Sequence, residues 1–496
     1  MPKDGSPEAK AMTDAEKELL KAWVEAGALF PQVQQRPFVS ETDFLKAMRD
    51  YLLTVKADDR RNIRFYSFAH LHNNPNVSEL DMRLYRAALS KAINSLTWSR
   101  ELYLPKPLPG TYDTVYVIDL QQLGWDTAGL WQAILSQYPY GLKYDFISDD
   151  EKKQVWKDVL QLSGVDMPYL RADWFVVNAT QPPLYHQLLD LPHTLMDLEH
   201  RLQLDTRRNF LDGRVQRSGF AKSGVSKQNR LLERHTSPVT PYFWISYDFL
   251  PRRARGDLSR FPLGPRFNGN PFNNQAFDHD GGEIIFSLPN GMQAYMLVNA
   301  KGDRIDSGPI EVVFDRSAVL GTPTIINGIS CIYCHRDGMI SDFRDELRTA
   351  EALGGLAREH LRKTYPPAEE MNELVSHDRE LFMRALERAT GPFLKQGADA
   401  DRPVGSFPEP VGKVAEMYSR DLTPIELALE LGFRDVAPLQ ARIAGSRELL
   451  RFGLGTMVQE PPGTLKREKW ETRDGTSLMQ DVASELRLGL PFVPAR

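Results

Sequence analysis

Cys331, Cys334 and His335 stand within five residues of one another, and the chain of 496 residues contains no other cysteine. The spacing C-x-x-C-H is the one that covalent attachment of haem c requires. Each thiol adds to one vinyl group of the haem, the two intervening residues match the vinyl separation, and the adjacent imidazole is placed under the iron. The motif therefore predicts one covalent haem c, with Cys331 and Cys334 as its thioether residues.

The iron of such a group takes axial ligands from the protein. His335 is expected to be the proximal ligand, because its position next to Cys334 leaves its imidazole little freedom to miss the iron. The distal ligand decides the chemistry: methionine suits electron transfer, a second histidine lowers the potential, and an open position permits ligand binding or peroxide chemistry. We favour His279 as the distal ligand, and the other candidates are His235, Met292 and Met296.

Two other uses of the cysteines remain open. A zinc site would need two further ligands. A thioredoxin-like redox pair would place C-x-x-C at the start of a helix after a strand, and residues 324–329 are a candidate for that strand. Haem propionates could be bound by Arg217, Arg230 and Arg234, because a guanidinium group can donate two hydrogen bonds to one carboxylate. The alternative is that these arginines lie at the surface or only anchor loops.

Composition is that of an ordinary globular protein of two or three domains, with 42% hydrophobic and 26% charged residues. The net charge of −5 and a pI of about 6.1 give no reason to expect nucleic acid or an anionic membrane as partner. No run of 18 apolar residues occurs, so no membrane-spanning helix is predicted.

The first residues have no apolar stretch of the kind found in signal peptides. Because haem c is attached outside the cytoplasm, we expect a periplasmic protein whose natural chain starts upstream of Met1. Residues 13–28 predict an amphipathic helix. It resembles the closing helix of a small cytochrome c domain, and a plain leader helix is the alternative.

Four segments are expected: a leader helix (1–36), a helical N-terminal domain (37–165), a haem-binding region with a β-meander and the C-x-x-C-H motif (166–345), and a helical C-terminal region (346–496). The fold class is α+β and mostly helical, with a cytochrome c-like haem region that carries the inserted β-meander. Predicted strands are 114–120, 283–288, 292–299 and 310–314, and predicted helices include one starting at Ser40 and those over 61–72, 78–96, 342–354, 377–389, 423–431 and 437–452.

Several stretches carry a resemblance that covers most of the chain from about residue 60. They are residues 92–98, 181–186, 218–235, 243–249, 279–286 and 327–330. Together they resemble a poorly characterised family of bacterial c-type cytochrome domain proteins, common in proteobacteria and planctomycetes. The resemblance implies a periplasmic location and one covalent haem at Cys331, Cys334 and His335, and it supplies no substrate.

A small electron carrier needs about 100 residues around its haem, so most of this chain must serve as scaffold, docking surface or second active site. The leading hypothesis is a periplasmic monohaem c-type protein that exchanges electrons with a redox protein partner. The rivals are a haem enzyme, peroxidase-like or an oxidase with an open distal site, and a haem-based binding or sensor module. The sequence alone does not decide whether the protein is an enzyme.

Overall fold

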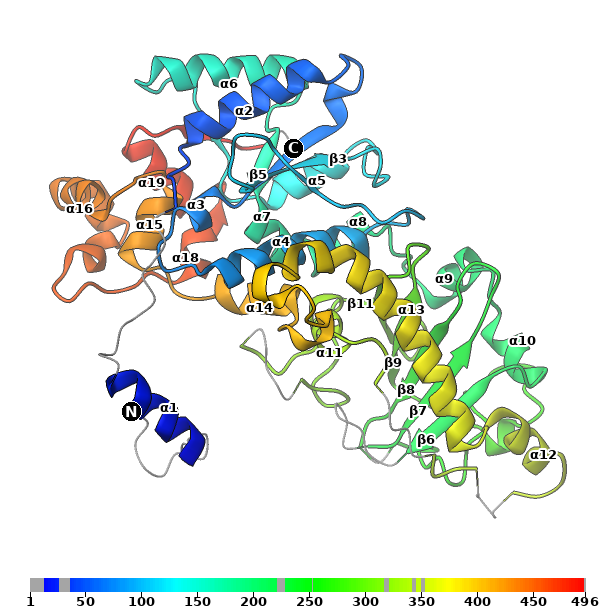
Figure 1. The fold of residues 1–496 in the computed structure, drawn as a ribbon. Coiled ribbons are helices and arrows are strands. Elements are labelled where there is room, and N and C mark those ends of the chain that lie inside the picture. Colours follow the sequence, from blue (N-terminus) through cyan, green and yellow to red (C-terminus); the bar gives the residue numbers. More distant parts are fainter. Residues whose placement is uncertain are drawn as a thin grey trace. The chain divides into compact units, whose positions relative to one another are not determined.

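Figure 1 shows the fold, taken from a computed structural model that describes residues 13–25, 36–220, 228–251, 253–315, 321–340, 345–348 and 353–494. Contacts between Cα atoms divide the chain into two units, Met1–Pro37 and Phe38–Arg496. The described part of the first unit contains helix α1 (Asp14–Glu25), within the helix expected over 13–28. The second unit mixes helices with sheets. None of the described helices is long and apolar enough to cross a membrane.

Two helices near the start of the second unit begin with capping boxes. Ser40 caps α2 (Glu41–Thr54) together with Asp43, and Ser78 caps α4 (Glu79–Ser95) together with Asp81. In each box the serine oxygen accepts the third helical N–H while the aspartate accepts the N–H of the serine. Helix α6 (Asp150–Ser163) packs beside α2 (Figure 1). The helix start predicted at Ser40 and the helix predicted over 78–96 are confirmed.

The first sheet has the strand order β2-β3-β1-β5. Strand β1 (Ile63–Ser67) pairs antiparallel with β3 (Val115–Asp119) and parallel with β5 (Tyr169–Arg171), and β2 (Lys106–Pro107) borders β3. The strand predicted over 114–120 is confirmed as β3. The helix predicted over 61–72 is wrong for its larger part, where β1 runs before the short helix α3 (Ala69–His72). Every residue of β1 is buried, including Arg64 and Ser67, so the segment lacks the regular alternation of apolar and polar residues that marks a half-buried strand.

The second sheet is an antiparallel meander of six strands in the order β11-β10-β9-β8-β7-β6. The strands predicted over 283–288 and 292–299 are confirmed as β9 (Gly281–Ser287) and β10 (Gln293–Asn299). The strand predicted over 310–314 is wrong, because a turn occupies its first residues; the meander continues instead into β11 (Arg304–Ile305). The remaining strands are β6 (Gln216–Phe220), β7 (Arg230–His235) and β8 (Phe243–Asp248).

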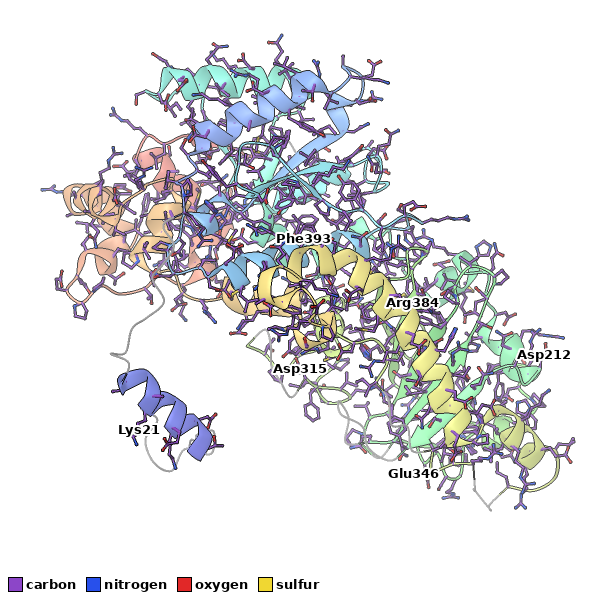
Figure 2. The ribbon with its side chains drawn as sticks, viewed as in Figure 1. Lys21, Asp212, Asp315, Glu346, Arg384 and Phe393 are labelled. Atoms are coloured by element: carbon purple, nitrogen blue, oxygen red, sulfur yellow. The ribbon has the colours of Figure 1, made fainter. Side chains whose placement is uncertain are left out.

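Helix α13 (Ala368–Leu394) lies across one face of this meander, and its course passes Arg384 and Phe393 (Figures 1 and 2). The carboxylate of Asp378 on α13 accepts hydrogen bonds of 2.8 Å from Arg234 Nε and Nη2 and from Trp244 Nε1. Because side chains alternate along a strand, the register places Glu283 and Tyr295 on the same face as Arg234 and Trp244. We call this the helix-covered face, and the other the opposite face.

The C-terminal helices follow the sequence in part. The helix predicted over 377–389 lies within α13, and that over 423–431 is α15 (Pro424–Glu430), which begins with a capping box at Thr423. The helix predicted over 437–452 is divided into α16 (Val436–Gly445) and α17 (Arg447–Arg451). Most of the stretch predicted over 342–354 lies outside the described residues, and residues 345–348 within it form bends and a turn rather than a helix.

One core cluster extends from Val39 to Phe492 and takes residues from all three segments expected after residue 36. The remaining elements surround it. They are α5 (Leu130–Gln137), β4 (Leu142–Lys143), α7 (Ala172–Ala179), α8 (Leu184–Leu188), α9 (Leu195–Arg201), α10 (Thr206–Leu211), α11 (Ile329–Cys334), α12 (Gly355–Thr364), α14 (Pro410–Tyr418), α18 (Arg467–Glu471), β12 (Arg473–Asp474), β13 (Thr476–Ser477), α19 (Leu478–Glu485) and β14 (Leu490–Pro491).

Candidate functional site

Both cysteines lie on the six-residue helix α11, three positions apart and therefore on neighbouring parts of its surface. The helix begins after Gly328, whose φ of +88° favours glycine. A Cβ at Gly328 would lie 2.4 Å from Thr180 O and 2.8 Å from the ring of Tyr185. The absence of a side chain thus lets α11 approach the end of α7 and α8 closely.

The imidazole of His335 follows directly at the end of α11. Its Nδ1 lies 3.2 Å from the carbonyl oxygen of Gly338, and its ring stacks on that of Tyr295 at a centroid distance of 6.0 Å. When Nδ1 donates its proton to a carbonyl, Nε2 keeps the lone pair. This is the tautomer that an axial iron ligand needs, and a carbonyl partner on the other nitrogen is the usual support for such a ligand.

Glu283 on β9 is the carboxylate at the centre of the motif. Its Oε1 lies 3.7 Å from His335 Nε2, and its Oε2 lies 3.4 Å from Arg230 Nη2. Burial raises the pKa of Glu283, but the interaction with His335 and the charge of Arg230 outweigh burial and lower that pKa to about 2. Arg230 Nε also pairs with Asp248 Oδ1 at 2.9 Å. The motif therefore contacts a strand carboxylate that is ionised at neutral pH.

The two thiols are held in the protonated form. Burial, with the Glu283 charge next, raises the pKa of Cys331 well above its ordinary value. The same causes, with Asp315 in addition, raise the pKa of Cys334 to about 12. A reactive redox dithiol needs a lowered thiol pKa. Residues 324–329 contain a bend, a single bridge, a turn and the first residue of α11 rather than a strand, so the thioredoxin-like alternative lacks its strand.

Tyr185 on α8 is hydrogen-bonded to the backbone of β10. Its hydroxyl accepts a hydrogen bond of 2.8 Å from the backbone N–H of Tyr295 and donates one of 3.1 Å to the backbone oxygen of the same residue. Both hydrogen bonds lie on the edge of β10 beyond its short pairing with β11. The ring that stacks on His335 is thus carried by a backbone segment anchored from α8.

The three arginines considered for haem propionates already have carboxylate partners. Arg217 pairs with Glu233, Arg230 with Asp248 and Glu283, and Arg234 with Asp378. Each of these guanidinium groups is nearly buried, so each pair stabilises the sheet or its packing against α13. In the described structure these arginines take part in internal ion pairs, and their binding of haem propionates stays a prediction.

The expected distal ligands lie elsewhere. His235 is buried on the opposite face with its Nε2 2.8 Å from Glu233 Oε1, and Met296 also points to that face by the strand register. The ring of His279 packs against Tyr247, again on the opposite face, at 5.1 Å, and Met292 is fully buried just before β10. Burial lowers the pKa of His279 to about 4. The structure does not bring these residues beside His335, and the distal assignment stays a prediction.

The side chains around α11 can be compared with what a zinc ion and a haem would each require. Within the described parts of the chain, no group of three or more His, Cys, Asp or Glu side chains is arranged to hold a metal ion, so the zinc alternative lacks its further ligands there. A covalent haem requires only two thiols and one axial nitrogen from the protein. Cys331, Cys334 and His335 supply these groups once the Glu283 carboxylate has moved away from His335 Nε2.

Sequence reasoning missed Glu283 as a member of the site, and it named Arg230 only as a candidate for haem propionate binding. Both lie on strands far from the motif along the chain, and only the sheet register brings them to α11. A signal existed in the two glycines that precede Glu283: a Cβ at Gly282 would lie 2.0 Å from Ser246 O, which marks a close approach of β8 and β9. Comparison of the chain with protein-family models, curated proteins and solved structures finds no match.

Proposed function

We propose that this protein is a periplasmic monohaem c-type protein that exchanges electrons with a redox protein partner. The observation that carries the proposal is the arrangement at α11. Two protonated thiols occupy one short helix, and the imidazole that follows has its Nδ1 turned to a backbone carbonyl. This combination suits a covalent haem with an axial nitrogen and does not suit a reactive dithiol.

Each residue of the site has a defined part in this proposal. Cys331 and Cys334 tether the group, and His335 Nε2 is the axial nitrogen. Gly338 O holds the imidazole in the required tautomer, and Tyr295 limits its rotation. The haem, when bound, supplies reversible one-electron chemistry. The cytochrome c-like character proposed for residues 166–345 is restricted to this local site, and the six-stranded meander forms its support.

A haem-binding enzyme or sensor with an open distal position is the second candidate. The placement of His235, His279 and Met296 favours it, since these expected ligands belong to the opposite face of the sheet. An iron without a protein ligand on its distal side would bind small molecules or peroxide. The two candidates share the same covalent site and differ in the sixth ligand.

The test is visible spectroscopy of the chain exported to a periplasm that matures c-type cytochromes. We expect one haem per chain that stays attached when the protein is denatured and washed. The matched control is the double variant Cys331→Ser/Cys334→Ser, which should retain none. Absence of haem absorption from the denatured, washed wild-type protein would contradict both candidates.

The spin state separates the two candidates. A low-spin ferric spectrum with a sulfur-to-iron charge-transfer band indicates a methionine ligand and electron transfer. A high-spin ferric spectrum that changes when cyanide or peroxide is added indicates the open site. His279→Gln gives the direct check on the expected distal histidine: it converts low-spin iron to high-spin if His279 is the ligand.

A further inference from the structure

Two cavities meet at a cluster of buried charged residues that the haem proposal does not use. The larger, of about 310 Å³, is lined by tyrosines at positions 138, 140, 144 and 169, and the smaller has about 160 Å³. His70 on α3 and Glu430 at the end of α15 line both cavities. The volume of the larger cavity is sufficient for a small organic molecule.

His70 and Asp173 form a hydrogen-bonded pair between these cavities. His70 Nε2 lies 2.9 Å from Asp173 Oδ2, and the Asp173 side chain is only 2% exposed. Burial raises the pKa of Asp173, but the interactions with His70 and Arg171 outweigh burial and hold the pKa well below its usual range. An ionised Asp173 accepts the Nε2 proton, so His70 carries its lone pair on Nδ1.

The surroundings of His70 favour its neutral imidazole. Burial, followed by the charge of Arg171, lowers the pKa of His70 and outweighs the opposite effect of Asp173. No hydrogen bond engages Nδ1 among the described residues, and the side chain keeps 11% exposure. A neutral imidazole that an aspartate holds in one tautomer beside a cavity is the arrangement of a general base.

Arg171 on β5 brings unused hydrogen-bond donors to the same place. Its Nη2 lies 3.4 Å from Asp173 Oδ2 and 2.8 Å from Glu430 Oε1. Its Nε and Nη1 are buried and, within the described structure, have no hydrogen-bond partner. The guanidinium carbon lies 4.0 Å from the ring of Tyr140, which with Arg171 lines the larger cavity. Buried donors without partners are costly, which suggests that another group uses them.

We propose that His70, Asp173 and Arg171 form a second active site that hydrolyses small carboxylic esters. His70 is the general base, Asp173 is a positioning residue, and Arg171 stabilises the negative charge that develops on the carbonyl oxygen. The aromatic wall of the larger cavity favours an ester with a small aryl group. This site shares no residue with the one at α11.

The reaction consumes only water. His70 Nδ1 takes a proton from a water molecule while the water oxygen bonds to the ester carbonyl carbon, and the carbonyl π electrons move to the oxygen that faces Arg171. The electron pair on the carbonyl oxygen then re-forms the C=O bond as the bond from carbon to the leaving oxygen breaks, and the leaving oxygen receives the proton from His70. The products are a carboxylic acid and an alcohol, and no group is oxidised or reduced.

The test uses the full chain and p-nitrophenyl acetate as the probe. We expect saturable hydrolysis by the wild-type protein and a fall of about 100-fold in kcat for His70→Gln, whose amide keeps a hydrogen bond to Asp173. Added imidazole should restore activity to His70→Ala, which a purely structural role of His70 does not explain. Asp173→Asn should lower kcat with KM unchanged, because the imidazole then loses its tautomer.

The matched control is His360→Gln. His360 on α12 is also a half-buried histidine with a lowered pKa, of about 4, but it has no carboxylate partner among the described residues. Its replacement should leave ester hydrolysis unchanged. If His70→Gln fails to fold, modification by diethyl pyrocarbonate provides the second measurement. Loss of activity should follow modification of His70, located by mass spectrometry.

Two results would overturn the proposal. One is a wild-type rate that rises linearly with ester concentration and equals the rate of His70→Gln. The other is loss of activity that follows the modification of a histidine other than His70. Removal of the haem-site cysteines leaves these readouts unaffected, so failure of the haem proposal and failure of this one are distinguishable.

Discussion

Glu283 Oε1 lies 3.7 Å from His335 Nε2, so a strand carboxylate faces the nitrogen that would bind iron. The same carboxylate raises the thiol pKa of both Cys331 and Cys334. The carboxylate of Glu283 thus places one negative charge beside all three residues of the motif. Attachment of a haem requires that this contact between Glu283 and His335 be broken.

Glu283→Gln is therefore expected to destabilise the haem-free protein. The amide cannot replace the ionic contact with Arg230, and a buried donor left without its partner costs about 1–3 kcal/mol. Urea unfolding of haem-free protein measures the change. The exposed Glu311→Gln is the matched control and should shift the free energy of unfolding by less than about 0.5 kcal/mol. Equal stability of the two variants would contradict an anchoring role for Glu283.

Gly328→Ala should prevent α11 from reaching its position. The added Cβ meets Thr180 O at 2.4 Å, in addition to the strain of a φ of +88°. We expect a loss of stability of several kcal/mol and a loss of haem from protein matured in a periplasm. Gly164→Ala separates the two causes, because its φ is +67° and nothing lies within 4 Å of the added Cβ. It should cost only about 1–2 kcal/mol and leave the haem content unchanged.

Asp378→Asn should be among the most destabilising single changes in the sheet region. The variant leaves the buried Arg234 without its anionic partner, and breaking a buried ion pair costs about 3–5 kcal/mol. The exposed pair of Glu448 with Arg451 serves as control. Glu448→Gln should cost less than about 1 kcal/mol, since solvent screens such pairs. Urea unfolding of both variants gives the comparison, and similar losses would show that α13 does not depend on this pair.

Acidification should destabilise the protein in a defined range. Interaction with Arg217 and His235 lowers the pKa of Glu233 from 4.5 to about 2 against the opposing effect of burial, and Arg171 and Arg467 do the same for Glu430. Between pH 4.5 and about 2 the unfolded chain therefore binds more protons at these carboxyls than the folded chain. Their stabilisation is present above pH 4.5 and is lost as the pH falls towards 2.

Urea unfolding measured at several pH values checks this expectation. The free energy of unfolding should decline across this range in the wild-type protein. Glu233→Gln should have a shallower decline, because one of the two carboxyls has been removed. A stability that stays constant from pH 5 to pH 3 would mean that these carboxylates have similar pKa values in the folded and unfolded chains.

Features encoded by a few neighbouring residues could be predicted from the sequence. The capping boxes at Ser40 and Thr423 and the turn between β9 and β10 are of this kind. Strands β6, β7 and β8 were not predicted. In β6 and β7, buried charged residues such as Arg217 and Glu233 conceal the alternation of apolar and polar positions. Their pairing becomes evident only when the partner strands are in place.

The residues of the candidate sites also fall into those that are neighbours along the chain and those that only the fold brings together. Cys331, Cys334 and His335 are neighbours along the chain, so their grouping needs no fold. Glu283 reaches them through the sheet register, and His70 meets Asp173 because β1 and β5 pair in parallel and lead into α3 and α7. Contacts of this second kind depend on strand order, which single-residue patterns do not specify.

The hydroxyl of Tyr185 has a consequence for the behaviour of the protein at high concentration. β11 pairs with only Leu297 and Val298 of β10, so the edge at Tyr295 has no neighbouring strand among the residues that the structure describes. Tyr185 occupies both backbone groups of Tyr295 and so substitutes for that strand. An uncovered edge invites pairing with a strand of another molecule. The side chain of Tyr185 therefore leaves no free backbone group at Tyr295 for such pairing.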